Sequence, residues 1–423
     1  MNSSDSFILI RSIIFNIEKK INVDSYKYSN IYIWPILRLA IYIYLKKQYN
    51  NHQSVSFPKK INSKVKSLLL KLSYKLTNNK NYNLKNLYFG SNSHRILKDG
   101  KYENKFFSNE NLVVEYDNNL FNLGSNTITL EKLVKLNKNL RNSRNDLNEI
   151  FSKVKEFIPK SVNYNLIKNF CEISLKYYES FQEQLNCPEL KNVFILCYYS
   201  PPMLGLTIFC KINRINTVEV QHGPISDLHL AYSGWDNCNV KKYQCIPHQI
   251  DIWHHGFKKY VEDTFNKISV EGNYYLKKLK YNKEVIKDSI LITLQMSDST
   301  LNEIYLHILE ELGDKYKIIL RKHPRQVISS EMNNKIKDLN YRYKNLFFQK
   351  GSESINDVLN NSFIHITAHS GTFFEALHFK IPTIFLSQRA TEYFHTFIQS
   401  KYFINCTNST KEEITQKIRE NAP

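Results

Sequence analysis

Two short segments of this sequence, each centred on a histidine, carry side chains suited to catalysis or to anion binding. The first is Gln221-His222-Gly223-Pro224, which follows the valine-containing run 216–220. A histidine titrates near neutral pH, so His222 can act as a general base toward a hydroxyl group, or it can contact a phosphate. Gly223 allows a ligand to approach the backbone closely. Both roles for His222 stay open at this point.

Residues near this segment are candidates for orienting the imidazole. They are Glu219, Asp227, His229 and Tyr232. Glu219 alternates with two valines, a pattern that also fits a carboxylate facing solvent.

The second segment is Arg321-Lys322-His323-Pro324-Arg325, which ends the apolar run 316–320. Proline stops a strand and fixes the turn, so we expect Pro324 to hold His323 at the edge of a sheet. Arg321 and Arg325 add planar donors that can bind a phosphate through two hydrogen bonds. This segment predicts contacts to the phosphates or the base of a nucleotide.

A third loop, residues 368–372, precedes an apolar helical segment. Ser370, Gly371 and Thr372 supply hydroxyl groups and close backbone approach, which a diphosphate needs at a helix N-terminus. The alternative is that Ser370 or Thr372 only caps the helix. Glu375, one turn later, can accept hydrogen bonds from the two hydroxyls of a ribose, or it can simply interact with the helix dipole.

Alternating strands and helices from 289 to 387 position the second segment and the third loop. Five predicted strands alternate with helices, which is typical of an open parallel sheet that binds ligands at the carboxyl ends of its strands. The strands are 290–294, 316–320, 346–349, 363–367 and 382–386. The helices are 301–312, 332–339, 353–359 with Ser352 as its cap, and 373–379.

The first half of the chain predicts a similar sheet. A strand at 86–89 leads into a polar loop, and helical patterns fill 130–185. A strand at 192–197, a helix at 201–213 and a strand at 216–220 then form a right-handed parallel crossover. We expect the residues of the polar loop to line an acceptor site or cleft together with Gln221, Gly223, His229 and Tyr232; they are Ser91, Ser93, His94 and Arg95.

Length and composition are typical of a folded protein with two to three domains. The chain has 423 residues, of which 42% are hydrophobic and 13% aromatic. Its seven cysteines are an odd number without a Cys-x-x-Cys pair, which favours reduced thiols in the cytoplasm. Cys197, inside an apolar run, is expected to behave as a small hydrophobic residue. No metal-ligand cluster is evident.

The positive charge is concentrated at the N-terminus. Residues 1–84 hold 14 Lys or Arg and three acidic residues, so +11 of the net charge of +19 lies there. Basic helices in this extension fit an anionic membrane surface or a cap packed on the next domain. The apolar stretches 7–15 and 31–45 are too short to cross a bilayer, which needs about 20 residues. We expect a cytoplasmic protein, attached peripherally to the inner face of the plasma membrane.

These motifs together resemble bacterial capsule and surface-polysaccharide glycosyltransferases of the GT-B fold. The likeness rests on Val218-Glu219-Val220-Gln221-His222-Gly223, on His229-Leu230-Ala231-Tyr232-Ser233, on the run ending in His323-Pro324, on 368–386, and on 28–42 with Trp34-Pro35 and Arg38. The His-Pro motif followed by a Ser/Thr motif is also similar to that of bacterial sialyltransferases and polysialyltransferases. The His-Gly loop is similar to that of teichoic-acid glycerophosphate polymerases.

The resemblance implies an α/β fold of two Rossmann-like doubly wound domains that face a cleft. The expected domains are a basic helical extension (1–84), an acceptor domain (85–275), a donor domain (276–410) and a C-terminal helix (411–423). The implied activity is transfer of a sugar from a nucleotide-sugar donor to an oligosaccharide or lipid-linked glycan of a capsule or lipopolysaccharide. Arg321, His323, Pro324, Arg325, Ser370, Gly371, Thr372 and Glu375 would then contact the donor, and His222 would be the candidate base.

Three departures from the family patterns bear on the mechanism. A Glu-x7-Glu motif beginning at Glu375 would end at Thr383, so this motif of many retaining enzymes is absent and inversion is favoured. No Asp-x-Asp occurs, so no metal or other cofactor is expected and basic side chains would neutralise the leaving group. The acidic motif of sialyltransferases is not identifiable, which argues against a sialic acid donor.

Two other interpretations remain open. A nucleotide-sugar 2-epimerase of the same fold would convert a free nucleotide sugar without an acceptor. A basic nucleic-acid-binding protein would interleave arginines and aromatic residues over a surface, whereas the charge here is mainly lysine in the N-terminal extension. We therefore expect no nucleic-acid partner.

Overall fold

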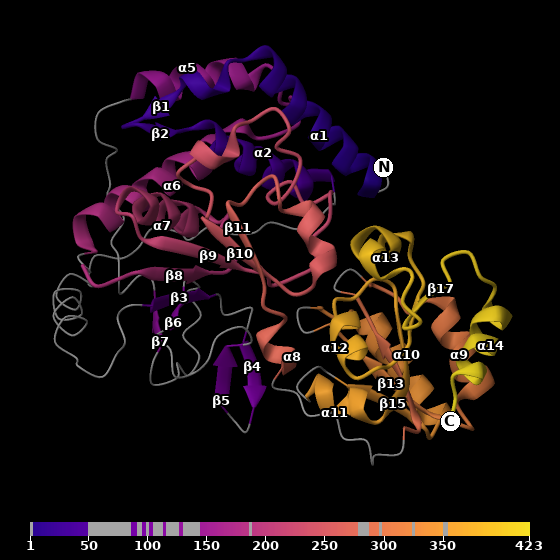
Figure 1. Ribbon diagram of the computed structural model, residues 1–423. Coiled ribbons are helices and arrows are strands. Elements are labelled where there is room, and N and C mark those ends of the chain that lie inside the picture. Colours follow the sequence, from indigo (N-terminus) through magenta and orange to yellow (C-terminus); the bar gives the residue numbers. More distant parts are fainter. Residues whose placement is uncertain are drawn as a thin grey trace. The chain divides into compact units, whose positions relative to one another are not determined.

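The protein forms two compact α/β units (Figure 1). The computed structural model describes residues 3–49, 86–90, 95–98, 101–104, 113–115, 127–129, 144–185, 188–277, 287–295, 298–323, 326–349 and 354–423. Unit 1 is Met1–Tyr274 and unit 2 is Tyr275–Pro423. The predicted fold class, α/β with two Rossmann-like sheets, is confirmed.

Unit 2 is built on a parallel sheet of six strands in the order β14-β13-β12-β15-β16-β17. The strands are β12 (Ser289–Thr293), β13 (Lys317–Arg321), β14 (Leu346–Gln349), β15 (Ser362–Thr367), β16 (Thr383–Phe385) and β17 (Phe403–Asn405). The direction of winding reverses between β12 and β15, where such sheets bind ligands. The prediction of five strands was incomplete, because β17 has only three residues.

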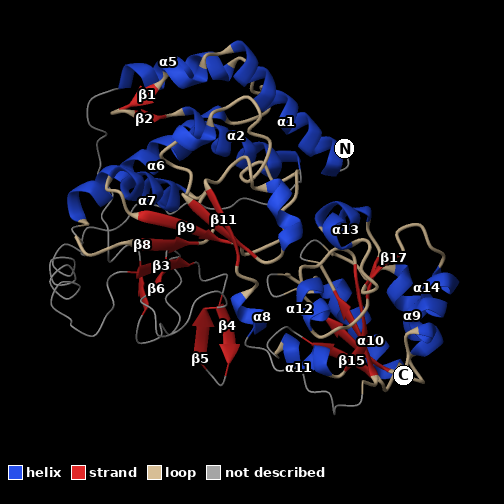
Figure 2. Ribbon diagram, in the orientation of Figure 1, coloured by secondary structure: helices blue, strands red, loops and turns tan. Residues whose placement is uncertain are grey.

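Side chains of successive residues in these strands enter different hydrophobic clusters. Ile290 and Ile292 belong to a large cluster with residues of α9 (Glu303–Leu312), α10 (Ser330–Arg342) and α14 (Lys411–Glu420). Leu291 lies between them and packs in a second cluster with α11 (Ile355–Asn360) and α12 (Phe373–His378). Helices therefore cover both faces of the sheet, which is why its strands read as continuous apolar runs (Figure 2).

Short-range capping explains where several helices of unit 2 begin. The side chain of Asn302 accepts a hydrogen bond from the N–H of Ile304 before α9, and Ser329 accepts one from Met332 in α10. Thr410 and Glu413 form a reciprocal capping box at the start of α14. The predicted cap Ser352 lies outside the described residues; α11 begins after Ser354 instead. The remaining helices are α13 (Gln388–Tyr393) and the 3-10 turn η6 (His395–Phe397).

Unit 1 contains a parallel sheet of seven strands in the order β11-β10-β9-β8-β3-β6-β7. They are β3 (Asn86–Gly90), β6 (Val113–Glu115), β7 (Thr127–Thr129), β8 (Asn192–Ile195), β9 (Asn216–Val220), β10 (Gln249–Ile252) and β11 (Lys267–Val270). The winding reverses between β3 and β8, as it does between β12 and β15 in unit 2. A separate antiparallel pair is formed by β4 (Arg95–Lys98) and β5 (Lys101–Asn104). Strands β6, β7, β10 and β11 of the sheet had not been predicted, and neither had the pair β4 and β5.

Two long helices pack closely beside this sheet. α6 (Tyr164–Gln184) and α7 (Pro201–Ile212) meet at Gly205, where an added Cβ would lie 2.6 Å from the Cβ of Tyr177. Only glycine allows the two backbones to approach this far. The other helical segments of the unit are α5 (Arg144–Lys155) and the 3-10 turns η4 (Val240–Lys242) and η5 (His255–Tyr260), while α8 (Tyr274–Lys277) lies at the boundary between the units.

The N-terminal segment packs on the rest of unit 1. It comprises α1 (Ser3–Lys20), the turn η1 (Val23–Ser25), the hairpin β1 (Lys27–Tyr28) and β2 (Ile31–Tyr32), and α2 (Trp34–Tyr49). Most of α2 is buried, including Arg38, and it contacts α6. Most of the apolar stretch 31–45 is thus a core helix, preceded by the short strand β2, as the packed-cap interpretation expects. The basic segment 59–80 lies outside the described residues, and no helix in the described part of the chain is long and apolar enough to span a membrane.

Candidate functional site

The polar residues of unit 1 gather at the carboxyl ends of β8 and β9. β9 ends at Val220 and is followed by Gln221 and His222. The Gln221 side chain accepts a hydrogen bond from the backbone N–H of Trp253 (2.7 Å) and donates one to the carbonyl of Gly223 (2.9 Å). Gln221 thereby fixes the loop that carries His222 against the end of the neighbouring strand β10.

Glu219 and His222 face each other at the end of β9. The Nδ1 atom of His222 lies 3.7 Å from Oε1 of Glu219, and the side chains are 15% and 0% exposed respectively. Tyr232 donates a hydrogen bond to Oε1 of Glu219 (2.6 Å), and the backbone N–H of Tyr198 donates to Oε2 (3.0 Å). The interpretation of Glu219 as solvent-facing was wrong, because its side chain is fully buried and accepts hydrogen bonds from Tyr232 and Tyr198.

Burial shifts the pKa values of this pair in opposite directions. It raises the pKa of Glu219 to about 8, against the opposing hydrogen bonds from Tyr232 and two backbone N–H groups. It lowers the pKa of His222 to about 4, against a hydrogen bond with the backbone of Val220. At neutral pH the imidazole is therefore neutral, which is the form that accepts a proton.

The opposite nitrogen of His222 meets residues from the end of β8. Its Nε2 atom lies 3.0 Å from Sγ of Cys197 and 3.3 Å from the hydroxyl of Tyr199. Cys197 has a φ of 58°, in the left-handed region that non-glycine residues seldom adopt. The expectation that Cys197 is a simple core residue was wrong, since its thiol touches the candidate base and the residue is only half-buried. Its position in an apolar run of the sequence carried no signal of this contact.

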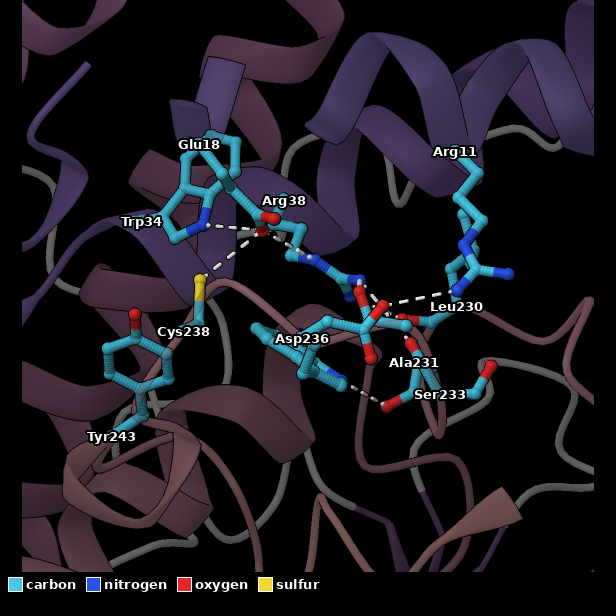
Figure 3. A network of polar contacts seen from close by, with 12 residues as sticks. Arg11, Glu18, Trp34, Arg38, Leu230, Ala231, Ser233, Asp236, Cys238 and Tyr243 are labelled. Atoms are coloured by element: carbon cyan, nitrogen blue, oxygen red, sulfur yellow. Dashed lines mark hydrogen bonds and ion pairs between the residues drawn. The ribbon is translucent and has the colours of Figure 1, made fainter. Parts of the chain in front are cut away.

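A buried network holds the segment that bears Tyr232. Arg38 is fully buried, forms an ion pair with Glu18 (3.1 Å), and donates hydrogen bonds to the carbonyls of Leu230 and Gly234. Its guanidinium also stacks on Trp235, 3.7 Å from the ring centroid. Figure 3 shows Arg38 between Glu18 and the 230–234 segment.

Glu18 completes this network from α1. One of its carboxylate oxygens accepts hydrogen bonds from the indole of Trp34 (3.1 Å) and from the thiol of Cys238 (3.3 Å), besides the bond from Arg38. The Trp34 and Arg38 motif noted in the sequence therefore ties the N-terminal segment to the loop after β9. Because Tyr232 of that loop bonds Glu219, the network supports the His222 pair from a distance.

His229 stands in an aromatic cluster beside the pair. Its ring centroid lies 4.6 Å from that of Tyr232, 5.3 Å from Tyr199 and 5.6 Å from Tyr42. Burial, together with the nearby charge of Lys46, holds the pKa of His229 well below its ordinary value. Among the described residues, its Nδ1 atom has no hydrogen-bond partner. Of the candidate orienters, Asp227 is exposed.

In unit 2 the loops after β12, β13 and β15 are joined by hydrogen bonds. Gln295, after β12, donates to the hydroxyl of Thr367 at the end of β15 (2.9 Å). Gln326, after β13, donates to the carbonyl of Asp298 (2.8 Å), and Asp298 accepts from the N–H of Gln295 (2.8 Å). These three linking residues, missed from the sequence, bring the loops together where the winding of the sheet reverses.

Some polar groups of the loop after β15 form hydrogen bonds with one another. The Ser370 hydroxyl accepts from the N–H of Thr372 (3.2 Å) and donates to its hydroxyl (3.1 Å). These bonds close a turn before α12 and do not cap it, because the N-cap residue is Thr372 and its side chain makes no capping hydrogen bond. Gly371 is exposed, and a Cβ added to it would meet nothing within 4 Å, so the loop has open space above it. Glu375 lies in the first turn of α12 and is 6% exposed.

The basic residues at the carboxyl end of β13 lie at the same edge of the sheet. Arg321 is 7% exposed and donates to the side chain of Gln349 (2.9 Å), while His323 is half-buried. The backbone N–H of His323 donates to the side chain of Gln326 (3.2 Å). The predicted contacts Pro324 and Arg325 lie outside the described residues.

His369 is a further residue at this edge that the sequence reading did not single out. Its Nδ1 atom is buried and, in the part of the chain that the structure describes, has no hydrogen-bond partner. Burial and the nearby charge of Arg389 lower the pKa of His369 to about 4. Its place directly before Ser370, in a loop already predicted to bind phosphate, could have marked His369 as a candidate from the sequence.

The remaining candidates cannot be placed in either cluster. Ser91, Ser93 and His94 lie outside the described residues, and Arg95 begins β4 without a described side chain. Among the residues that the structure describes, no group of three or more His, Cys, Asp or Glu is arranged to hold a metal ion.

No family model and no curated protein matches this chain. Among solved structures, UDP-GlcNAc 2-epimerase from Methanocaldococcus jannaschii is 14% identical over 79% of this chain and 91% of that chain, with a TM-score of 0.44. The calicheamicin glycosyltransferase CalG4 is 10% identical over 79% and 89%, with a TM-score of 0.45. UDP-GlcNAc 2-epimerase from Neisseria meningitidis, bound to UDP-GlcNAc, is 15% identical over 73% and 82%, with a TM-score of 0.44. Likeness at this level carries no argument about the reaction of this chain.

Proposed function

We propose that this protein is an inverting glycosyltransferase of the GT-B type. Unit 2 binds a nucleotide-sugar donor, and unit 1 activates an acceptor hydroxyl through His222. The observation that carries the proposal is the contact between His222 and the buried Glu219 at the end of β9. A neutral imidazole backed by a carboxyl group is the arrangement that a general base needs.

In the proposed reaction the acceptor hydroxyl gives its proton to Nε2 of His222. Its oxygen forms a bond to the anomeric carbon of the sugar, and the bond between that carbon and the nucleotide phosphate breaks. The electron pair stays on the phosphate oxygen. The positive charge that the imidazole gains lies beside the Glu219 carboxyl group, 3.7 Å from its Oε1 atom, and lowers the pKa of that group. Tyr232 holds that carboxylate in place.

The leaving nucleotide is stabilised in this proposal by the edge of unit 2. Arg321 and His323 would supply positive charge or hydrogen bonds, and the loop Ser370 to Thr372 would supply hydroxyls around the open space at Gly371. Glu375 remains our candidate for the ribose hydroxyls. α12 has only six residues, so its dipole contributes little and side chains carry the binding. The donor needs no metal in this scheme, because the cations of the protein neutralise the phosphate.

The acceptor is proposed to be an oligosaccharide or lipid-linked glycan of a bacterial capsule or lipopolysaccharide. This part rests on the resemblance of the Gln-His-Gly and His-Pro motifs to surface-polysaccharide enzymes. The competing reaction is 2-epimerisation of a nucleotide sugar, which requires no acceptor. The two reactions differ in their products, and product analysis therefore separates them.

A two-stage experiment tests the proposal. Thermal shifts with UDP, GDP, CDP and CMP identify the nucleotide, since a bound ligand raises the melting temperature. His323→Ala should reduce that shift, whereas His378→Ala, which changes an exposed histidine of α12, should not. The matching nucleotide sugars are then incubated with and without glycan acceptors. Free nucleotide released only with an acceptor supports transfer; a new epimer formed without one would replace the proposal by the epimerase interpretation.

A further inference from the structure

The outer face of α1 combines exposed apolar side chains with exposed cations. Ile8 is 65% exposed, Leu9 38% and Phe15 42%, and these are three of the ten exposed large hydrophobic residues in the described part of the chain. Arg11 and Lys19 are exposed on the same helix. Such clustering on one helix differs from the scattered apolar residues of an ordinary surface.

The spacing separates this face from the packed face of α1. Phe7, Ile10, Ile14 and Ile17 are buried and follow one another at intervals of three and four residues. A second set, Ile8, Ser12, Phe15 and Lys19, is also spaced at intervals of three and four residues, and each of these side chains is exposed. A helix places residues at these intervals on one stripe, so the second set points away from the core.

Among the side chains that the structure describes, the charges on this face are mainly positive. Glu18, the carboxylate of the second half of α1, is turned inward and paired with Arg38, so it does not offset the cations. Lys19 and Lys20 are exposed, and the ammonium of Lys19 lies over the ring of Phe15 at 5.4 Å from its centroid. The neighbouring exposed carboxylate is Asp236, which pairs with Arg11 (3.1 Å) (Figure 3).

We propose that this face, made of Ile8, Leu9, Arg11, Phe15, Lys19 and Lys20, binds the surface of an anionic lipid bilayer. The apolar side chains would enter the boundary between headgroups and acyl chains, while the cations contact anionic headgroups. A protein partner with an apolar surface would leave the lysines without counter-charges, so the interleaved cations favour lipid. The inference does not depend on the proposed reaction.

Vesicle binding tests this surface on the full chain. The purified protein is sedimented with vesicles of phosphatidylcholine and with vesicles that also contain phosphatidylglycerol. We expect binding to the anionic vesicles that weakens as salt is added. The double variant Ile8→Asp, Phe15→Asp should bind at least tenfold more weakly. Val327→Asp, which changes a valine of unit 2 that is 91% exposed, should bind like the wild type.

A second variant keeps the test decisive if the first proves unstable. Lys19→Glu with Lys20→Glu alters two exposed side chains and should lower binding to anionic vesicles several-fold, with unchanged melting temperature. Equal binding by wild type and both variants would overturn the proposal, as would failure of the wild type to bind. A concentration-dependent dimer that Ile8→Asp, Phe15→Asp abolishes, without vesicle binding, would assign the face to a second copy of the chain instead.

Discussion

At the scale of single residues, Glu219 and His222 are coupled through their protonation. Burial of Glu219 keeps a proton on the carboxyl group up to a pH of about 8, whereas a free glutamate releases it near 4.5. In the window between these values the folded state binds a proton that the unfolded state has lost. Folding stability contributed by this residue therefore falls as pH rises through the window.

Glu219→Gln should remove that pH dependence. Glutamine has nearly the same shape and does not titrate. When the pH rises from about 4.5 to about 8, the unfolding free energy of the variant should therefore fall less than that of the wild type. Urea unfolding of both proteins at several pH values measures the difference. Parallel curves for wild type and variant would contradict a raised pKa for Glu219.

The chemistry of these residues could be predicted only in part. The motif Gln221-His222-Gly223 singled out His222, because polar residues directly after a strand lie at the ligand edge of a parallel sheet. Its partners were harder to find. Cys197 is 25 positions away and appeared apolar by context. Contacts that depend on a left-handed residue and on a neighbouring strand have no periodic signature in the sequence.

At the scale of elements, Arg38 joins α2 to the loop after β9. Arg38→Met should destabilise the protein by about 3–5 kcal/mol, because it leaves the carboxylate of Glu18 buried without its partner. Arg11→Met is the matched control: it breaks an exposed pair with Asp236, and such pairs contribute about 0–1 kcal/mol. Chemical denaturation measures both. Equal losses of unfolding free energy in the two variants would show that burial does not make the Arg38 ion pair more important for stability than the exposed Arg11 pair.

The contact between α6 and α7 makes a second test. Gly205→Ala places a methyl group 2.6 Å from Cβ of Tyr177 and 2.7 Å from the carbonyl oxygen of Ser174, so the helices must separate. We expect a loss of about 1–3 kcal/mol, typical of overpacking. Gly223→Ala meets nothing within 4 Å and should leave the unfolding free energy unchanged. If Gly205→Ala leaves the unfolding free energy unchanged, α6 and α7 can move apart without a loss of stability, which would contradict the expected overpacking.

Regular elements were predicted better than short ones. The strands of unit 2 were located to within a residue or two, because helices on both faces demand uninterrupted apolar runs. β17, with Phe403 to Asn405, is too short to give such a run, and β10 carries Gln249 and Asp251 among its four residues. The close packing at Gly205 and the burial of Arg38 required the tertiary structure.

At the scale of the whole molecule, the chain divides into two units at Tyr274 and Tyr275. Unit 2 has its own clusters of buried apolar side chains on both faces of its sheet. We therefore expect residues 275–423 to fold alone and to unfold cooperatively. The isolated unit should also show the same nucleotide-induced rise in melting temperature as the full chain. A fragment that folds but does not bind nucleotide would place the donor site elsewhere.

The most direct test of the proposed transferase separates catalysis from donor binding in the full chain. His222→Ala should lower sugar transfer by about 100-fold to 10,000-fold, the usual effect of losing a general base, while the nucleotide-induced thermal shift stays as in the wild type. His255→Ala, which changes an exposed histidine of the same unit, should retain full turnover. Turnover by His222→Ala equal to that of the wild type would contradict the assignment of His222 as the base.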